Sequence, residues 1–170
     1  INRFNFNESH SHATVSTLAA DLGNTPIFLS LCTGGKLHII SEERLFNPAQ
    51  MVDYFKHNQI DLLKIVPSHL EALLNIENAD LILPKKWLIV GGESFSYELL
   101  NKIQQFTHEC LIVNEYGPTE ATIICASYAA NSGEPVRGQM VGKPLRNVVL
   151  RVLDERGRVW SSAGDGVHVF

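Results

Sequence analysis

The chain has 170 residues, of which 45% are hydrophobic and 19% are charged. That is enough apolar material for one compact domain and too much for a disordered chain. The formal net charge is -4, with 14 basic and 18 acidic residues spread along the sequence. No apolar run approaches the roughly 18 residues of a membrane helix. We therefore expect neither nucleic acid nor a membrane as a partner.

The three cysteines, Cys32, Cys110 and Cys125, form no close C-x-x-C pair, and each lies in an apolar run. This pattern favours buried free thiols over a disulfide or a zinc site. The first ten residues have neither the cationic nor the apolar region of a signal peptide. A reducing, cytoplasmic location fits both observations.

Short apolar runs alternate with helical patterns over the first 130 residues. The predicted strands are 12–18, 36–40, 61–66, 86–90 and 110–114. The predicted helices are 27–32 with Asn24 as cap, 49–57 after Asn47 and Pro48, 69–74 after Pro67, and 97–106 capped by Ser96. Such alternation indicates an α/β fold: a doubly wound, mainly parallel sheet with flanking helices, as in flavodoxin-like subdomains.

The pattern changes at about residue 131, where Gly, Pro and Arg become frequent. An alternating strand is predicted over 147–154, followed by a turn at 155–158. We therefore divide the chain into an α/β substrate- and nucleotide-binding subdomain, 1–130, and a loop with the beginning of a smaller β subdomain, 131–170.

Ligands of doubly wound sheets bind beyond the carboxyl ends of the strands. The loops after Val66, Val90 and Val113 are therefore the candidates for a site. The last of them, 114–122, offers an amide, an aromatic ring, a hydroxyl and a carboxylate, which suit an adenine ring, a phosphate and its Mg²⁺. From residue types alone, a plain turn with Thr119 as helix cap and Glu120 as a solvated acid is an equally good interpretation.

The string N-E-Y-G-P-T-E at 114–120 closely resembles the N-x-Y-G-P-T-E signature of the adenylate-forming superfamily. Within it, the chain is most similar to the amino-acid-activating adenylation domains of nonribosomal peptide synthetases. Three further stretches, I-V-P-S at 65–68, V-G-G-E at 90–93 and V-G-K-P at 141–144, resemble family motifs in order and spacing. The resemblance covers nearly the whole chain but weakens beyond about residue 157.

The resemblance implies ATP and Mg²⁺ as ligands. Asn114 would bind the adenine edge, Tyr116 would stack on its face, Thr119 would contact the α-phosphate, and Glu120 would hold Mg²⁺. Thr119 and Glu120 would thus be the catalytic residues. The implied nucleotide-binding set is Gly91, Gly92, Glu93, Asn114, Tyr116, Gly117 and Thr119.

The resemblance also implies a pocket for the amino acid. Asp21 falls where the family keeps an Asp that pairs with the substrate α-ammonium group. The implied substrate-binding set is Asp21, Leu22, Thr25, Lys64, Ile89, Gly91, Glu115, Ile123 and Ile124. This set resembles the family's asparagine and aspartate pockets.

Physical chemistry points the same way at Lys64 and Glu115. Lys64 interrupts an apolar strand, where an unpaired buried ammonium is costly, so it must reach solvent or face a polar group. Lys64 can donate to a side-chain amide oxygen while Glu115 accepts from the amide NH₂, and the two can neutralise each other in an empty site. Aspartate would set its carboxylate against Glu115, so asparagine is favoured. An internal ion pair without a substrate role is the alternative.

Ser9 to His12 places two histidines at alternate positions, a spacing able to bind a metal, but no third ligand lies nearby. We expect a surface or loop segment there.

The resemblance implies that the parent protein activates an amino acid with ATP to aminoacyl-AMP and loads it onto the phosphopantetheine thiol of a carrier protein. The family's phosphate loop would precede Ile1, and its ribose-binding Asp and catalytic Lys would follow Phe170. We therefore expect an inactive central piece whose partners are the amino acid, the remaining adenylation subdomains and a peptidyl carrier protein.

Two alternatives remain. One is an acyl- or aryl-acid–CoA ligase of the same superfamily, against which Asp21 argues because such substrates carry no ammonium group. The other is a non-catalytic flavodoxin-like binding or scaffold module.

Overall fold

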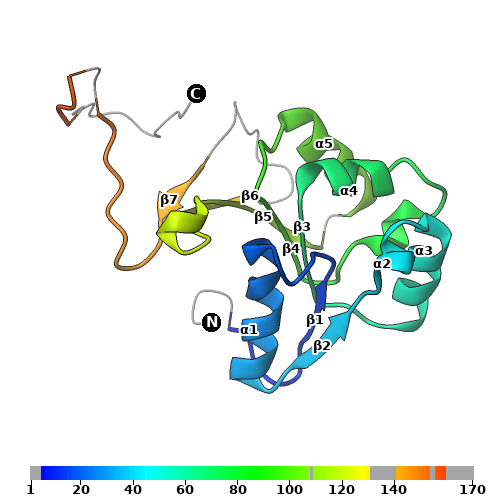
Figure 1. The fold of residues 1–170 in the computed structure, drawn as a ribbon. Helices are drawn as coiled ribbons and strands as arrows, with labels where there is room; N and C mark the ends of the chain where they lie inside the picture. Colours follow the sequence, from blue (N-terminus) through cyan, green and yellow to red (C-terminus); the bar gives the residue numbers. More distant parts are fainter. Residues whose placement is uncertain (1–4, 108, 131–140, 154–155, 160–170) are drawn as a thin grey trace.

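The computed structural model describes residues 5–107, 109–130, 141–153 and 156–159. In this part of the chain a seven-stranded sheet has the strand order β2-β1-β3-β4-β5-β6-β7 (Figure 1). The parallel strands are β1 (Ser11–Thr14), β2 (Lys36–Ile39), β3 (Leu62–Ile65), β4 (Trp87–Gly91) and β5 (Leu111–Tyr116). Two antiparallel strands follow, β6 (Ala126–Ala130) and β7 (Lys143–Pro144). The predicted α/β fold class is confirmed.

Helices lie on both faces of this sheet. They are α1 (Asn24–Thr33), α2 (Glu42–Leu45), α3 (Pro48–His57), α4 (Pro67–Leu73) and α5 (Tyr97–Phe106), with short 3-10 helices η1 (Asp21–Gly23), η2 (Ala79–Ile82) and η3 (Thr119–Ala121). Figure 1 shows α1 on one face and α3, α4 and α5 on the other.

Most of the predicted helix signals are confirmed. The Asn47 side chain accepts a hydrogen bond from the Gln50 backbone N–H at the start of α3. Ser96 does the same for the Leu99 N–H in α5. At the end of α1, Gly34 takes the left-handed conformation with φ 74°, which glycine adopts without a steric penalty.

Two predicted boundaries near the amino terminus are wrong. The strand expected over 12–18 ends at Thr14, because the last residues alongside it are Ile39 of β2 and Lys64 of β3. Asn24 lies inside α1 rather than capping it, and Gly23 takes the cap position without a side-chain hydrogen bond. Residues 15–20 instead form a connection from β1 to η1.

The end of the sheet also differs from the prediction. β6 was not expected, because Ala-rich residues 126–130 have weak strand propensity. They form a strand through antiparallel pairing with β5, and β7 then pairs with β6. The sheet therefore continues beyond residue 130, and the division of the chain at that position stays a prediction.

The predicted strand at 147–154 is wrong for its described residues, 147–153. They contain an isolated bridge from Leu153 to Val159, across the predicted turn, but no strand. Val149 and Leu153 are 77% and 55% exposed. Alternation stabilises a strand only when a neighbour covers its apolar face, and no described strand lies beside this segment.

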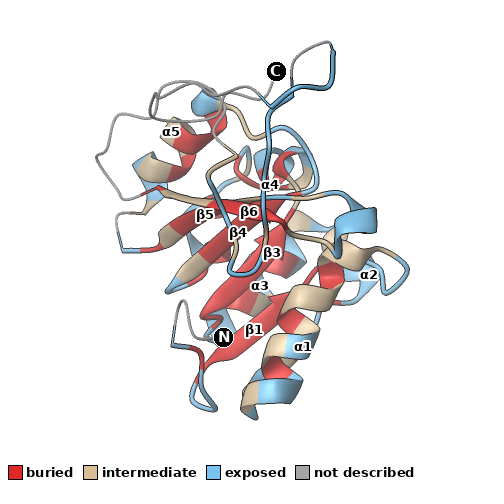
Figure 2. Ribbon diagram, turned by 90° about the vertical axis from the view of Figure 1, so that its left-hand side faces the viewer, coloured by how far each residue is buried: buried red, intermediate tan, exposed pale blue. Residues whose placement is uncertain are grey.

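The sheet separates a large core from a small one. Alternate residues of the central strands, such as Leu63, Leu88 and Ile112, point into the large core beneath α3, α4 and α5. Their neighbours Leu62, Ile89 and Val113 form the small core with Phe6 and with Leu29 of α1. Figure 2 shows the buried central strands between these layers.

The cysteine prediction holds at two of three positions. Cys110 and Cys125 are buried free thiols, and burial raises the pKa of Cys110 to about 12. Cys32 is exposed, so the prediction of a buried thiol is wrong there. Its apolar run is helical, and a helix distributes consecutive residues around its whole circumference.

The expectation of a surface or loop segment at residues 9–12 holds at Ser9, which is exposed in a turn, but is wrong at Ser11 and His12, which are buried in β1. His10 and Ser11 are 7% exposed and His12 is fully buried in β1. Burial, together with the nearby His10, lowers the pKa of His12, whose Nδ1 lies 2.8 Å from Ser30 Oγ. No group of three potential metal ligands occurs among the described residues.

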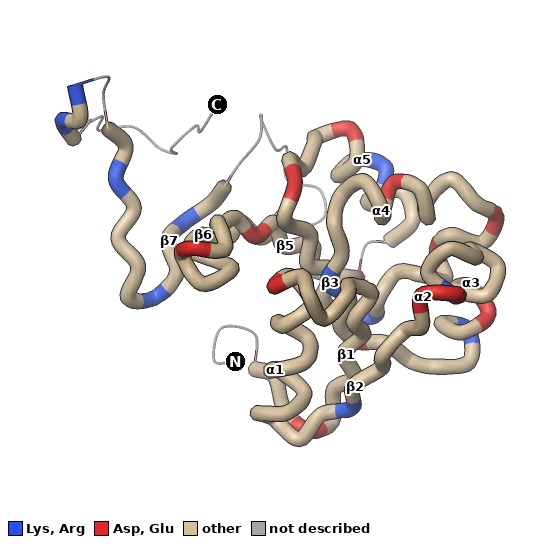
Figure 3. Tube along the Cα trace, viewed as in Figure 1, with Lys and Arg blue, Asp and Glu red and all other residues tan. Residues whose placement is uncertain are grey.

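The longest helices in the described chain have ten residues, and none is long and apolar enough to cross a membrane. Figure 3 shows acidic and basic positions interspersed around the helices, with several further basic positions after β6.

Candidate functional site

A cavity of about 550 Å³ opens at the carboxyl ends of the parallel strands. The order β2-β1-β3-β4-β5 reverses direction between β1 and β3, and ligands of such sheets bind at this switch point. The cavity wall includes Val15 and Ser16 just beyond β1, and Lys64 to Val66 at the end of β3. The sequence argument for this edge therefore agrees with the position of the cavity.

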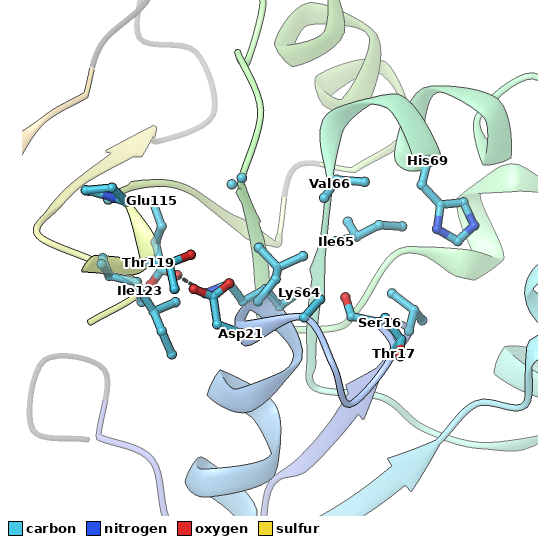
Figure 4. Close-up of a pocket in the computed structure, with 18 residues that line it drawn as sticks. Ser16, Thr17, Asp21, Lys64, Ile65, Val66, His69, Glu115, Thr119 and Ile123 are labelled. Carbon is cyan, nitrogen blue, oxygen red and sulfur yellow. Dashed lines mark ion pairs between the residues drawn. The ribbon is translucent and has the colours of Figure 1, made fainter. Parts of the chain in front are cut away.

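Most of the predicted site residues line this cavity. They are Asp21, Leu22, Lys64, Gly91, Gly92, Glu115, Gly117, Thr119, Ile123 and Ile124. In Figure 4, Asp21, Thr119 and Ile123 lie toward one end, and Ser16, Thr17 and His69 toward the other. The cavity is thus larger than the predicted amino-acid pocket.

A buried ion pair stands at the centre of the site. Lys64 Nζ lies 2.8 Å from Glu115 Oε2, and the two side chains are only 2% and 10% exposed. Lys64 therefore does not reach solvent but faces the cavity. The predicted mutual neutralisation of the two residues is confirmed as an ion pair, marked by the dashed line in Figure 4.

The ion pair spans three strands. Lys64 is on β3 and Glu115 on β5, with β4 between them, so the strands that carry them are about 10 Å apart. Gly91 is the β4 residue beside Glu115 in the register. A Cβ atom at Gly91 would lie 2.7 Å from the Glu115 carbonyl oxygen, closer than real contacts allow. Glycine at this position therefore lets the β4 backbone approach the β5 backbone closely beside the ion pair.

Two predicted pocket residues do not line the cavity. Ile89 is 1% exposed and belongs to the small core below it. Thr25, in the first turn of α1, accepts a hydrogen bond at its Oγ1 from Lys64 Nζ, at 2.8 Å. The structure thus brings Thr25 to the site through Lys64.

The wall at Ile123 is built on unusual backbone. Thr122 and Ile123 have φ angles of 60° and 74°, which β-branched residues rarely adopt. The Ile124 N–H donates to the Thr122 carbonyl at 2.9 Å, closing a tight turn around Ile123. Gly117 permits this turn, since a Cβ there would lie 2.6 Å from the Ile123 carbonyl oxygen.

Four predicted nucleotide or metal residues lie outside the cavity wall. Tyr116 ends β5 with its side chain 43% exposed, and Asn114 lies in β5 beside Val90 and Tyr128. Glu120 is exposed in η3. Both carboxylate oxygens of Glu93 accept hydrogen bonds from Ser68, one from its N–H and one from its hydroxyl, each at 2.9 Å. The roles given to these residues stay predictions.

The carboxylate of Glu120 suits a Mg²⁺ ion that is bound to a nucleotide. It suits less well an ion whose ligands all come from the protein. Mg²⁺ is usually bound through one or two carboxylates together with phosphates and water. Glu120 supplies one exposed carboxylate beside Thr119, which lines the cavity.

Several residues of the wall were not predicted: Val15, Ser16, Thr17, Ala20, Ile65, Val66, His69 and Pro118. Burial lowers the pKa of His69, although a hydrogen bond with the Leu45 backbone raises it in part. Its imidazole is therefore neutral at pH 7. The predicted helix after Pro67 already put His69 in the first turn beyond β3. That position was the sequence signal that could have identified His69 as part of the wall.

Comparisons with known proteins agree with this geometry. A family model described as "AMP-binding enzyme" matches residues 1–167. Bacitracin synthase 3 from Bacillus licheniformis is 34% identical over 154 residues, covering 89% of this chain and 2% of that protein. The chain therefore spans a small fraction of this relative's length.

Solved structures share the fold. Holo-PA1221, an NRPS protein containing adenylation and PCP domains, matches with a TM-score of 0.81 and 19% identity, over 92% of this chain and 27% of that chain. The Vibrio cholerae adenylation domain AlmE, solved with glycyl-adenosine-5'-phosphate, matches with a TM-score of 0.77 and 24% identity, over 93% of this chain and 30% of that one. The family-model match covers nearly the whole sequence, so the chain belongs to the AMP-binding enzyme family.

Proposed function

We propose that the chain is the substrate-selecting part of a nonribosomal peptide synthetase adenylation domain. The parent protein activates an amino acid with ATP to aminoacyl-AMP. The family membership, the likeness to bacitracin synthase 3 and the cavity at the carboxyl edge of the sheet support this proposal. The glycyl-adenosine-5'-phosphate bound by AlmE is an aminoacyl adenylate of the same class.

The observation that carries the proposal is the buried Lys64–Glu115 pair facing the cavity. The ammonium donates to an acceptor oxygen and the carboxylate accepts from a donor, so together they match a side-chain amide. Asparagine satisfies both groups. Aspartate satisfies Lys64 but places a second carboxylate beside Glu115, which makes it the weaker substrate.

Asp21 separates this proposal from an acyl- or aryl-acid ligase. It lines the cavity at the start of η1, where its carboxylate can receive the α-ammonium group of an amino acid. Leu22, Ile123 and Ile124 provide the apolar part of the same wall. Asp21 is only partly buried, and a substrate without an amine offers its carboxylate no cationic partner in the cavity.

The remaining residues orient the nucleotide. Gly91 and Gly92 let the backbone approach the base, Tyr116 stacks on it, and Asn114 and Glu93 lie beside it on the same edge. Thr119 would contact the α-phosphate and Glu120 would hold Mg²⁺, which when bound would supply neutralisation of the phosphate charge. In the proposed reaction the substrate carboxylate attacks the α-phosphorus of ATP, and pyrophosphate leaves.

We further propose that the aminoacyl group passes to the phosphopantetheine thiol of a peptidyl carrier protein in the cytoplasm. The pairing of adenylation and PCP domains in holo-PA1221 supports this partner. Residues 1–170 alone should fold but not adenylate, because the resemblance places the phosphate loop and the catalytic lysine outside them.

The test is ATP–pyrophosphate exchange by the full-length parent protein. We expect exchange that depends on an amino acid, and none with succinamic acid, which resembles asparagine without its α-amine. An Asp21→Ala variant should lose at least tenfold in kcat/KM for asparagine. Exchange driven as well by succinamic acid as by asparagine would instead assign the chain to an acid ligase, and no exchange with any acid would favour a scaffold module.

A further inference from the structure

Two hydrogen bonds join the loop after β4 to the first turn of α4. Glu93 Oε2 accepts from the Ser68 N–H and Glu93 Oε1 accepts from the Ser68 hydroxyl, each at 2.9 Å. Val66 occupies the cap position of α4 and makes no side-chain cap hydrogen bond. A residue 25 positions away from Ser68 therefore supplies the acceptor that a capping side chain usually provides. The two bonds form the Glu93–Ser68 link.

The Glu93–Ser68 link borders the cavity wall without being part of it. Gly92, directly before Glu93, lines the cavity. So does His69, directly after Ser68 (Figure 4). Glu93 and Ser68 themselves do not line it. Because β3 and β4 are adjacent in the sheet, the link joins the connections that follow two neighbouring strands.

The wall is closely packed beside this link. Gly92 has a φ of 83°, a conformation that glycine adopts without a steric penalty. A Cβ atom at Gly92 would lie 3.3 Å from Leu22 Cδ1 and 3.5 Å from Val66 Cγ1. The Gly92 backbone thus lies against two other wall residues, so a displacement of the loop after β4 would change the shape of the cavity.

From this geometry we infer that Glu93 is a positioning residue: through Ser68 its side chain holds the loop after β4 against α4, and it does not bind the nucleotide. The resemblance implied a direct nucleotide contact for Glu93. Ser68 already holds both of its carboxylate oxygens, and a carboxylate is repelled by the phosphates of ATP. The inference rests on the proposed function, which puts the Gly92 backbone beside the base.

The link should affect nucleotide binding more than stability or the choice of amino acid. Glu93 and Ser68 are both exposed, so their hydrogen bonds satisfy no buried group and contribute little to overall stability. The proposed selection of the amino acid belongs to Lys64 and Glu115, which do not take part in the link. The expected signature is therefore a raised KM for ATP with little change in Tm.

The test is ATP–pyrophosphate exchange by the full-length parent protein at varied ATP concentration. Glu93→Ala should raise the KM for ATP about fivefold and leave kcat within about twofold of wild type. Ser68→Ala, which removes one of the two bonds, should raise it about twofold to threefold, whereas Ser68→Thr keeps the hydroxyl and should match wild type. Ser94→Ala, at the exposed neighbouring position, is the matched control. An unchanged KM for ATP in Glu93→Ala would overturn the inference.

A double-mutant cycle separates positioning from direct contact. In a Glu93→Ala background, Ser68→Ala should have no further effect on the KM for ATP, because the partner of its hydroxyl is gone. If Glu93 bound the nucleotide itself, Glu93→Ala would raise this KM but Ser68→Ala would not. That result, or an equal effect of Ser68→Ala in both backgrounds, would contradict the inference.

Two further readouts do not depend on turnover. The Tm values of the unliganded variants should lie within about 2 °C of wild type, and a larger loss would mean general destabilisation and overturn the inference. If Glu93→Ala fails to fold, Glu93→Gln, which keeps one acceptor oxygen, replaces it with an expected rise of about twofold to threefold. Absence of exchange by the wild-type parent with every amino acid would refute the proposed function alone, since calorimetric ATP binding by the same variants still decides the role of the link.

Discussion

The two faces of the sheet differ in the residues that the same strands place on them. On the face covered by α3, α4 and α5, the residues of β3 and β4, such as Leu63 and Ile65, are apolar to the end of the strand. On the α1 face, Leu62 and Val113 are apolar, but Lys64 and Glu115 follow them at the carboxyl ends of β3 and β5. In these strands one face therefore contributes only to the core, whereas the other carries charged groups where it reaches the cavity.

This comparison teaches that the site depends on strand alternation. Leu62 and Lys64 are two residues apart, as are Val113 and Glu115, so each charged side chain continues the line of a core residue. A one-residue shift in register would move both charges into the large core. The stable face thus fixes the position of the reactive one.

The largest expected effect is the loss of stability caused by a substitution that creates a cavity in the large core. Ile103 is fully buried on α5, and Ile103→Ala should lower the free energy of unfolding by about 2 to 5 kcal/mol. Urea denaturation of residues 1–170 would measure this loss. Substrate ratios in the parent protein should not change, and a shift in the asparagine-to-aspartate ratio would show that the two faces are not separable.

On the other face, Lys64→Met should reduce kcat/KM for asparagine by roughly a hundredfold, because both the substrate amide and Glu115 lose their charged partner. Leucine-dependent exchange should be less affected. Lys85→Met, at an exposed lysine, is the matched control and should leave both rates unchanged. Equal losses for asparagine and leucine would contradict a specific role for Lys64.

Glu115→His should change preference rather than abolish activity. A histidine can donate to a carboxylate where Glu115 repels it, so the aspartate-to-asparagine ratio should rise by about tenfold. Exchange with both substrates measures this ratio directly. An unchanged ratio would remove Glu115 from substrate choice and favour a purely internal ion pair.

The smallest expected effect concerns Asp61, which directly precedes β3 at the amino-terminal ends of the parallel strands. Burial alone would raise the pKa of Asp61, but hydrogen bonds from the Ser11 backbone and the Gln59 side chain, with Lys86 nearby, lower it below its usual 3.8. A lowered pKa stabilises the fold above pH 3.8, and this contribution is lost as the pH falls toward the lower folded value.

In Asp61→Asn, the free energy of unfolding should therefore fall less steeply with pH in the acid range. Substrate ratios should not change. Unfolding of the wild-type and variant chains between neutral pH and pH 3 measures the difference. Two parallel curves over this range would show that Asp61 contributes no pH dependence.

Sequence reasoning predicted what depends on local pattern. Short apolar runs, Pro67 and the caps Asn47 and Ser96 indicated the parallel sheet and its functional edge. The family resemblance and the cost of burying an unpaired ammonium predicted that Lys64 and Glu115 face each other in the site, where the structure pairs them.

Sequence reasoning missed what depends on contacts between distant elements. The Thr25 hydroxyl reaches Lys64 across 39 positions, and β6 forms only because β5 lies beside it. Cys32 was placed inside because an apolar run does not reveal which side of a helix is covered. The loop wall at Ser16 and Thr17 was missed because those residues were assigned to β1, whose partner strands end earlier.

The central claim is that paired charges on one face of the sheet select a side-chain amide. Its most direct test is the kcat/KM of the wild-type parent protein for asparagine, aspartate and leucine in ATP–pyrophosphate exchange. The account predicts that asparagine exceeds aspartate by at least tenfold, and that aspartate in turn exceeds leucine. Leucine as the best substrate would contradict it.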